Sequence, residues 1–225
     1  MFDVFSGSKM DDFVFPPGQV LHLQFYINEF DLCNPIGAKR GKYKLTAVYF
    51  VLGNCPQRIR FREDFIFLGL LACHRHVKKH DPQYERLFSP LVSDMEKLKD
   101  SIQITIDGVS QTFHACLDFV SADNLSAHEL GGFQCHFNPG RICRSCTIDY
   151  SLFRENLSEA SLVKRSEEID QYQLQAVLED ERDSAIYGIK HDCVLSQLDY
   201  FKVSRSFPHI MHDFLEGINY YMENF

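Results

Sequence analysis

The chain has 225 residues, a formal net charge of -8 and 45% hydrophobic residues, among them 20 Phe and 10 Tyr. This composition excludes a disordered protein and allows one large or two small domains with a substantial core. No apolar run reaches the roughly 18 residues of a membrane helix. Residues 1–12 carry acids where a signal peptide has a basic and then an apolar region, so we expect an intracellular protein.

The first half of the chain is predicted to contain two strands and two helices. Residues 19–27 and 45–52 are rich in strand-forming residues and are separated by a basic turn, which predicts a strand, a basic hairpin and a second strand. Residues 65–80 and 90–99 are predicted to be helical, with Pro90 at the start of the second helix.

The second half is predicted to continue with strands and to become helical and charged. In chain order we expect a strand at 101–106, a turn at Asp107-Gly108, a strand at 111–120, a short helix at 126–133, helix-forming polar sequence at 154–183 and an amphipathic stretch from Pro208. Strands and helices followed by a further strand that ends in an acid are expected of an α/β, RNase H-like mixed sheet flanked by helices. We predict this core in residues 1–137, and a cysteine knuckle with a mainly helical insertion segment in residues 138–225.

The net negative charge argues against a simple nucleic-acid-binding domain, but the charge is unevenly distributed. Residues 39–62 contain no acid, whereas residues 155–183 are dominated by Glu and Asp. The basic residues of the first segment are Lys39, Arg40, Lys42, Lys44, Arg58, Arg60 and Arg62. Such a stripe is suited to contacts with phosphate.

The eight cysteines are not arranged as a disulfide framework. Most stand singly, several of them in apolar runs, which is typical of buried thiols in a reducing compartment. Cys143 and Cys146, by contrast, have the spacing at which two thiols chelate one Zn²⁺, with two further ligands supplied from elsewhere. The alternative is a pair of free thiols, and no strand-to-helix sequence supports a thioredoxin-like redox site.

Six short motifs follow one another in a set order along nearly the whole chain. They are Asn34-Pro35-Ile36-Gly37; Asn54-Cys55-Pro56; Pro90-Leu91-Val92-Ser93-Asp94-Met95; Ser121-Ala122-Asp123-Asn124-Leu125 with Gly131-Gly132-Phe133; Cys143-Arg144-Ser145-Cys146; and Ile210-Met211-His212-Asp213-Phe214-Leu215-Glu216-Gly217. None is specific by itself. In this order and spacing they resemble the eukaryotic cut-and-paste transposases of the CACTA-like kind, as found in transposon-derived reading frames of animal genomes.

The resemblance implies a DDE transposase that acts on transposon-end DNA in the nucleus, with a homo-oligomer as one possible assembly. In such enzymes three carboxylates on one edge of an RNase H-like sheet hold two Mg²⁺ or Mn²⁺ ions for in-line attack on a phosphodiester. Asp123 matches the second acid, since it follows an apolar run that reads as a buried strand. Its alternative role is the N-cap of the following helix.

The first and third acids depart from this pattern. Where the family usually has an acidic pair after the first strand, the chain has Asn28 and Glu29, and strand alternation argues against Glu29 replacing a ligand at position 28. Glu216, with Asp213 one helical turn before it, is the candidate third acid, although a solvated helix face is the alternative. We expect this segment to belong to the helical insertion and the true third acid to have lain beyond Phe225, in a truncated reading frame.

The resemblance also pairs the cysteine knuckle with the Met-His element. It implies His212 as the third zinc ligand, with His209 one turn away and the fourth ligand open. Cys135, His136 and Cys193 are the candidates for that fourth position.

Lys39, Arg40, Lys42 and Lys44 are the expected DNA contacts. A second basic group contains His74, His76, Lys78, Lys79 and His80, and we interpret it as a solvated or phosphate-facing helix surface. His128 could contact substrate phosphate, or cap or pack its helix.

Two functional hypotheses follow from the sequence. The chain is either an inactive fragment of a strand-cleaving and strand-transferring enzyme, or a catalytically dead DNA- or protein-binding module with a structural zinc knuckle. A zinc-knuckle interaction module unrelated to transposition is a third reading, and it would be favoured if no mixed sheet had Asp123 at its edge.

Overall fold

The computed structural model describes residues 19–32, 43–136, 140–152 and 162–203. The chain divides into two compact units, the first formed by residues 1–121 and 197–201 and the second by residues 122–196 and 202–225. The predicted division at residue 137 therefore falls inside the second unit. None of the helices in the described ranges is both long and apolar enough to cross a membrane.

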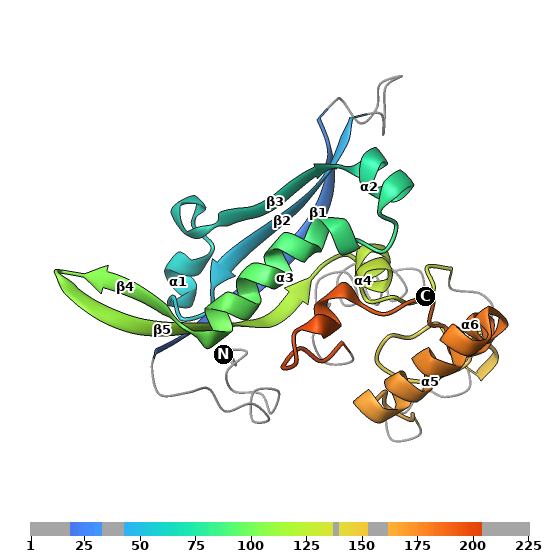
Figure 1. The fold of residues 1–225 in the computed structure, drawn as a ribbon. Coiled ribbons are helices and arrows are strands. Elements are labelled where there is room, and N and C mark those ends of the chain that lie inside the picture. Colours follow the sequence, from blue (N-terminus) through green and yellow to red (C-terminus); the bar gives the residue numbers. More distant parts are fainter. Residues whose placement is uncertain (1–18, 33–42, 137–139, 153–161, 204–225) are drawn as a thin grey trace, which may run out of the picture. The chain divides into compact units, whose positions relative to one another are not determined.

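The first unit is built on a five-stranded mixed sheet with the order β3-β2-β1-β5-β4 (Figure 1). The strands are β1 (Gln19–Asp31), β2 (Lys44–Leu52), β3 (Phe67–Cys73), β4 (Ile102–Ile106) and β5 (Val109–Ser121). β1 and β5 run parallel, and the other neighbours are antiparallel. The predicted strands at 19–27, 45–52, 101–106 and 111–120 are confirmed, as is their α/β mixed sheet.

One face of the sheet is covered by α3 (Glu85–Asp100). Phe88, Val92 and Met95 recur at helical spacing, and all three are buried. The helix contacts β5 and β3, and Phe25 and Ile27 of β1 are also buried, at 2% and 1% exposed. Burying side chains of this size stabilises the fold by about 1.5–3 kcal/mol each, so this contact supplies much of the core.

The predicted helix at 65–80 is wrong in its first half. Residues 67–73 form β3, and only residues 74–80 are helical, as α2 (His74–His80). A short apolar run fits a buried strand as well as a helix by periodicity. The outer edge of β2 decides between them, because its backbone N–H and C=O groups need partners and β3 supplies these along Leu45 to Phe50.

Pro90 does not start its helix, as had been predicted. α3 begins at Glu85 and contains Pro90 in its second turn. The helix starts earlier because the Asp81 carboxylate accepts a hydrogen bond from the backbone N–H of Leu87 at 2.7 Å, and Tyr84 adopts a left-handed conformation, with φ of 61°, immediately before the first turn. Those local interactions outweigh the one intrahelical hydrogen bond that Pro90 cannot make.

The remaining elements are short, apart from one helix. They are α1 (Gln57–Arg60), η3 (Glu63–Phe65), α4 (Asn124–Leu130), η4 (Tyr150–Leu152), α5 (Glu167–Glu179), η6 (Glu181–Asp183), α6 (Ser184–Tyr187) and η7 (Val194–Gln197). The predicted short helix at 126–133 is present as α4, two residues earlier. Of the predicted helical sequence at 154–183, the described part forms mainly α5, and the stretch from Pro208 lies outside the described residues.

The second unit is organised around a buried arginine. The Arg165 side chain is fully buried and pairs with Asp170 at 3.0 Å. The guanidinium also donates to the backbone carbonyl oxygens of Cys143 and Tyr187, at 3.0 and 2.9 Å. It lies over the Phe133 ring, 5.1 Å from the centroid, next to the apolar cluster formed by Phe133, Val177 and Ile189. A buried charge needs this many partners, so Arg165 holds the loops of this unit in place.

Two glycines with positive φ offer a matched test of packing in the second unit. Gly132 has φ of +76°, and a Cβ there would lie 2.0 Å from the carbonyl oxygen of His191. Gly108, in the β4–β5 turn, has φ of +79° and open space around it. We expect Gly108→Ala to cost about 1 kcal/mol for the left-handed conformation alone, and Gly132→Ala to cost about 3 kcal/mol or more because the backbone must also move. Urea unfolding measures both, and equal losses would contradict this packing.

Candidate functional site

Asn28 and Glu29 lie near the end of β1, on opposite faces of the sheet. In the register with β2, Asn28 faces Ala47 and Glu29 faces Thr46. The side-chain carbonyl of Asn28 accepts a hydrogen bond from the backbone N–H of Glu29 at 2.9 Å. Because successive side chains of a strand point to opposite faces, Glu29 does not offer its carboxylate where Asn28 offers its amide.

Glu29 is instead the centre of a small polar cluster. Lys44 Nζ donates to Glu29 Oε2 at 2.5 Å, and His74 Nδ1 lies 3.0 Å from Glu29 Oε1. The Thr46 hydroxyl lies 3.0 Å from the same ring nitrogen. The Glu29 side chain is only 11% exposed. Its charge is therefore balanced within the sheet, and Lys44 is engaged here as an ion-pair partner.

Asp123 forms the N-cap of α4. Its carboxylate accepts a hydrogen bond from the backbone N–H of Ser126 at 2.7 Å, as the capping alternative predicts. The neighbouring Asn124 accepts a hydrogen bond from Arg144 at 2.5 Å. Glu29 and Asp123 are the predicted acids within the described residues. Each of them has its ion-pair or hydrogen-bond partners within its own unit. Glu216 and Asp213 lie outside those residues.

The predicted acids do not fit a magnesium or manganese site. Hard divalent ions need several carboxylate oxygens directed at one point. One Glu29 oxygen faces an ammonium group and the other an imidazole, and the Asp123 carboxylate is hydrogen-bonded to a helix N-terminus. Neither residue belongs to a group of three potential metal ligands within the described ranges. In this arrangement Glu29 and Asp123 do not support a metal-dependent step.

The capping role of Asp123 predicts how substitutions there behave. Asp123→Ala should cost about 1 kcal/mol of stability, because the N–H of Ser126 loses its acceptor. Asp123→Asn and Asp123→Ser should cost only a few tenths of a kcal/mol, since both keep a capping oxygen. Thermal unfolding of the three variants measures this, and an equal loss in all three would show that the charge, and not the cap, is what matters.

Cys143 and Cys146 lie in a loop held against Arg165. Each sulfur accepts a backbone N–H from the residue two positions later, Ser145 at 3.3 Å for Cys143 and Ile148 for Cys146, and the two thiols interact with each other. Burial raises the pKa of the Cys146 thiol to about 11. The pair offers two sulfur ligands side by side, which fits half of a tetrahedral zinc site.

The other ligands predicted for the knuckle are not brought to it in the described part of the chain. Cys135 donates to the carbonyl of Phe133 at 3.7 Å, Cys193 is buried, and His136 is exposed. None of them forms a group of three metal ligands with the pair across the residues that the structure describes. His209 and His212 lie outside these residues, so the zinc site stays a prediction.

The raised pKa of Cys146 gives a chemical test of the knuckle. In metal-free protein this thiol stays protonated until the pH approaches 11, so its alkylation by iodoacetamide should accelerate about tenfold per pH unit between pH 8 and 10. Zinc, which binds the thiolate, should suppress the reaction across this range. Mass spectrometry of the peptide that contains Cys146 measures the rate of alkylation. A rate that is independent of pH would contradict the buried thiol, and a lack of protection by zinc would leave two free cysteines.

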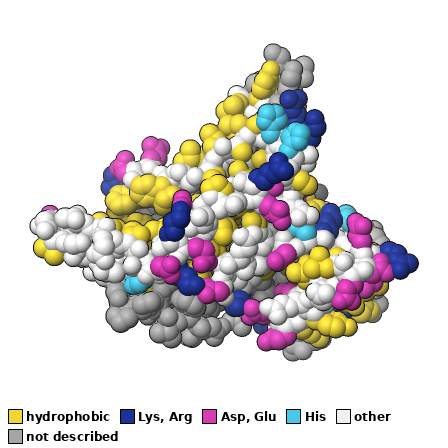
Figure 2. Space-filling model, in the orientation of Figure 1, with side chains coloured by type: hydrophobic (Ala, Val, Ile, Leu, Met, Phe, Trp, Pro, Cys, Tyr) yellow, Lys and Arg dark blue, Asp and Glu magenta, His cyan; other side chains and the backbone are white. Residues whose placement is uncertain are grey.

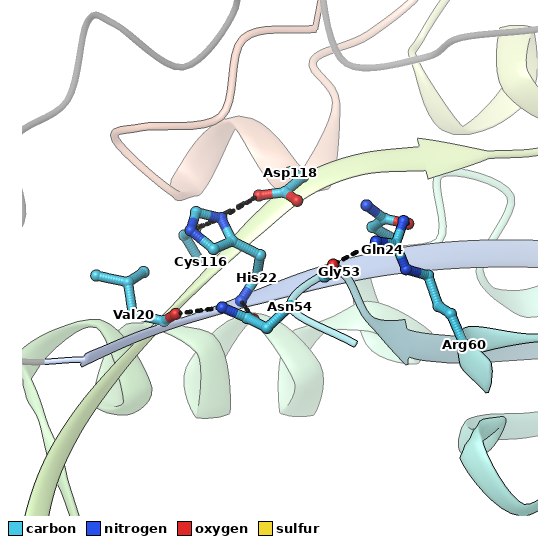
Figure 3. Close-up of polar contacts among 8 residues, drawn as sticks. All are labelled: Val20, His22, Gln24, Gly53, Asn54, Arg60, Cys116 and Asp118. Carbon is cyan, nitrogen blue, oxygen red and sulfur yellow. Dashed lines mark hydrogen bonds and ion pairs between the residues drawn. The ribbon is translucent and has the colours of Figure 1, made fainter. Parts of the chain in front are cut away.

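Three cations of the predicted basic stripe have structural roles. Lys44 pairs with Glu29, and Arg62 lies 3.2 Å from Asp64. The Arg60 side chain is buried and donates to the carbonyl oxygen of Gly53 at 2.5 Å (Figure 3). It also donates to the carbonyl oxygen of Cys55 at 3.0 Å. Of the other predicted DNA contacts, Lys39, Arg40 and Lys42 lie outside the described residues.

A second basic surface is formed by α2. Val77 is buried, whereas Arg75, His76, Lys79 and His80 are exposed. Figure 2 shows dark blue and cyan side chains gathered where α2 lies. This agrees with the interpretation of the helix as a solvated or phosphate-facing surface. His128, by contrast, is buried, with Nδ1 2.8 Å from the carbonyl oxygen of Gln134, and so packs its helix.

An apolar cavity lies against β1, β2 and β5. Its volume is about 580 Å³. Residues that line it include Tyr26, Tyr49, Phe61, Ile66, Phe119 and Ser121. None of its lining residues is charged, so it offers neither an anionic ligand for a metal ion nor a cation for phosphate.

Three residues that the sequence analysis did not single out as a site come together between β1 and β5. His22, Cys116 and Asp118 form the one group of three potential metal ligands in the described ranges, with ligand atoms all within 4.8 Å of one another (Figure 3). His22 and Cys116 are 94 residues apart in sequence. No spacing motif connects them, and only the pairing of the two strands brings them together.

No protein-family model matches the chain, and no curated protein matches it at the level of sequence.

Proposed function

We propose that the chain is a transposase-derived protein with an RNase H-like core that binds DNA in the nucleus but does not cleave it. The main observation behind this proposal is the ion pairing of Glu29. The Glu29 carboxylate, beside the expected first acid position, is paired with Lys44, lies 3.0 Å from His74 Nδ1 and is on the face of β1 opposite to Asn28.

The topology of the sheet supports the fold part of the proposal. β1 and β5 are central, adjacent and parallel, while β2 and β3 continue the sheet in antiparallel order. An RNase H-like core needs this arrangement because its acids come from the ends of two adjacent parallel strands. The antiparallel hairpin of β4 with β5 forms the other edge of the sheet.

The chemistry of the site supports the absence of cleavage. Two-metal catalysis requires carboxylates that stabilise the attacking and leaving oxygens through the bound ions. At position 28 the chain offers a neutral amide, and that amide is hydrogen-bonded to the backbone. Position 123 retains an acidic residue, but Asp123 serves as a helix cap. Asn28 and Asp123 therefore make hydrogen bonds that stabilise the local backbone, and they are not arranged to bind two metal ions.

The surface of α2 supports DNA binding. Exposed cations on one short helix can contact successive phosphates, and each contact releases condensed counterions. Arg75 and Lys79 are exposed there. The segment with Lys39, Arg40 and Lys42 is the second proposed contact. A structural zinc ion at the Cys143–Cys146 knuckle belongs to the same proposal and is supported by the N–H groups directed at both sulfurs.

The proposal predicts salt-sensitive duplex binding without strand cleavage. Arg75→Ala with Lys79→Ala should reduce the slope of log K against log salt by about 0.9 for each phosphate that the variant no longer binds. Lys97→Ala with Arg182→Ala is the matched control, because it removes two cations that are already paired with Asp94 and Asp180. Fluorescence anisotropy over a salt series measures the slopes, and equal slopes in the two double variants would contradict a phosphate-binding surface on α2.

Cleavage is tested on the same DNA with Mg²⁺ or Mn²⁺. We expect no nicking by the chain. Nicking that disappears in Asp123→Asn, which keeps the helix cap but removes the charge, would overturn the proposal and restore a catalytic role for Asp123.

A further inference from the structure

The strongest unexplained feature of the first unit is the contact between His22 on β1 and Cys116 on β5. The two residues are direct partners in the parallel register. Their side chains lie on the same face, with Cys116 Sγ 3.3 Å from His22 Nδ1 (Figure 3). Asn54 fixes the backbone beside them by accepting from the N–H of His22 at 2.7 Å and donating to the carbonyl of Val20 at 2.9 Å.

A β-bulge adds a third ligand to this pair. Leu23 faces Leu117, whereas Gln24 faces Phe119, so Asp118 is an extra residue in β5 without a partner on β1. Bulges are rare between parallel strands, and they typically redirect a side chain beside a functional site. Here Asp118 Oδ1 lies 2.8 Å from His22 Nδ1 and 3.6 Å from Cys116 Sγ.

The burial of Asp118 leaves one oxygen without a partner. Its side chain is 1% exposed, and Oδ2 has no hydrogen-bond partner among the described residues. A buried carboxylate with an unsatisfied oxygen is costly, and a bound cation would supply the missing interaction. The His22 side chain is 18% exposed, which leaves a route from solvent to the three ligand atoms.

The distances fit a metal ion better than a catalytic triad. With bonds of about 2.0–2.3 Å, the donor atoms of a tetrahedral zinc site lie roughly 3.3–3.6 Å apart. The two distances from Cys116 Sγ, 3.3 Å to His22 Nδ1 and 3.6 Å to Asp118 Oδ1, fall in this range, and only the 2.8 Å between Nδ1 and Oδ1 is shorter. A nucleophile–base–acid relay needs the thiol on one ring nitrogen and the carboxylate on the other. Cys116 and Asp118 both approach Nδ1, which excludes a relay in this arrangement.

The state of the thiol agrees with this interpretation. Burial, reinforced by the charge of Asp118, raises the pKa of Cys116 well above its ordinary value. A metal ion deprotonates a thiol that it binds, so the site does not depend on a free thiolate.

We propose that His22 Nδ1, Cys116 Sγ and Asp118 bind one divalent ion of the zinc class, with water or the second Asp118 oxygen in the fourth position. Binding releases the thiol proton to solvent, and the imidazole proton occupies Nε2. Sulfur, imidazole and carboxylate together favour zinc or cobalt over magnesium or calcium. The ion would join β1 to β5 at the bulge, independently of DNA binding and of the Cys143–Cys146 knuckle.

Cobalt titration of the full chain tests this site. The background variant is Cys143→Ser with Cys146→Ser, which removes the knuckle. We expect it to take up one Co²⁺ per chain, with the near-ultraviolet band of a thiolate–cobalt bond and the visible bands of tetrahedral cobalt, and zinc should displace the cobalt. Adding Cys116→Ser or Asp118→Asn should weaken binding at least tenfold. Cys193→Ser is the matched control, because Cys193 is also buried and single, and it should bind as the background does.

Two outcomes count against the site. A background variant that takes up no cobalt, or a thiolate–cobalt band that persists in Cys116→Ser, would overturn the proposal. Asp118→Asn has the shape of the native residue, so it reports on the site even where Cys116→Ser fails to fold. Circular dichroism establishes that each variant is folded, and undiminished affinity in a folded Asp118→Asn would exclude that ligand.

Discussion

The parallel pairing of β1 with β5 is the contact on which the rest of the first unit depends. Parallel strands cannot be joined by a tight turn, so the intervening chain has to cross from one end of the sheet to the other. This connection contains β2, β3, α2, α3 and β4. The pairing also decides which side chains meet, since it aligns His22 with Cys116 and Tyr26 with Ser121, the last residue of the strand before Asp123.

Buried charge explains how the expected acids are used. An ion removed from water needs a partner of opposite charge and further hydrogen bonds. Glu29 obtains these from Lys44 and His74, and Arg165 obtains them from Asp170, a glutamine and backbone carbonyls. Such networks stabilise a fold, but they leave few lone pairs for a catalytic metal. Asp118 differs from Glu29 in its ion-pair partners: a lysine pairs with Glu29, whereas the ion pair of Asp118 is with His22, through Oδ1, and its Oδ2 is buried without a hydrogen bond.

Elements with short-range sequence signals, such as a turn or a helix cap, were predicted correctly. The β4–β5 hairpin follows from alternating residues on both sides of Asp107 and Gly108, which both take the positive φ that the turn requires. The cap of α4 by Asp123 follows from its position before the helix. The first half of the helix predicted at 65–80 was wrong because its apolar run is ambiguous, and hydrogen bonding along the edge of β2 selects a strand there.

Short-range sequence patterns predicted the α/β class, the positions of four of the strands and the Cys143–Cys146 pair, because each depends on residues close together in the chain. Tertiary structure alone decided the environment of each carboxylate. Whether Glu29 meets a cation depends on the register of β1 with β2 and on where α2 begins. The meeting of His22 with Asp118 depends on one extra residue in β5, and a bulge between strands distant in sequence leaves no periodic signal.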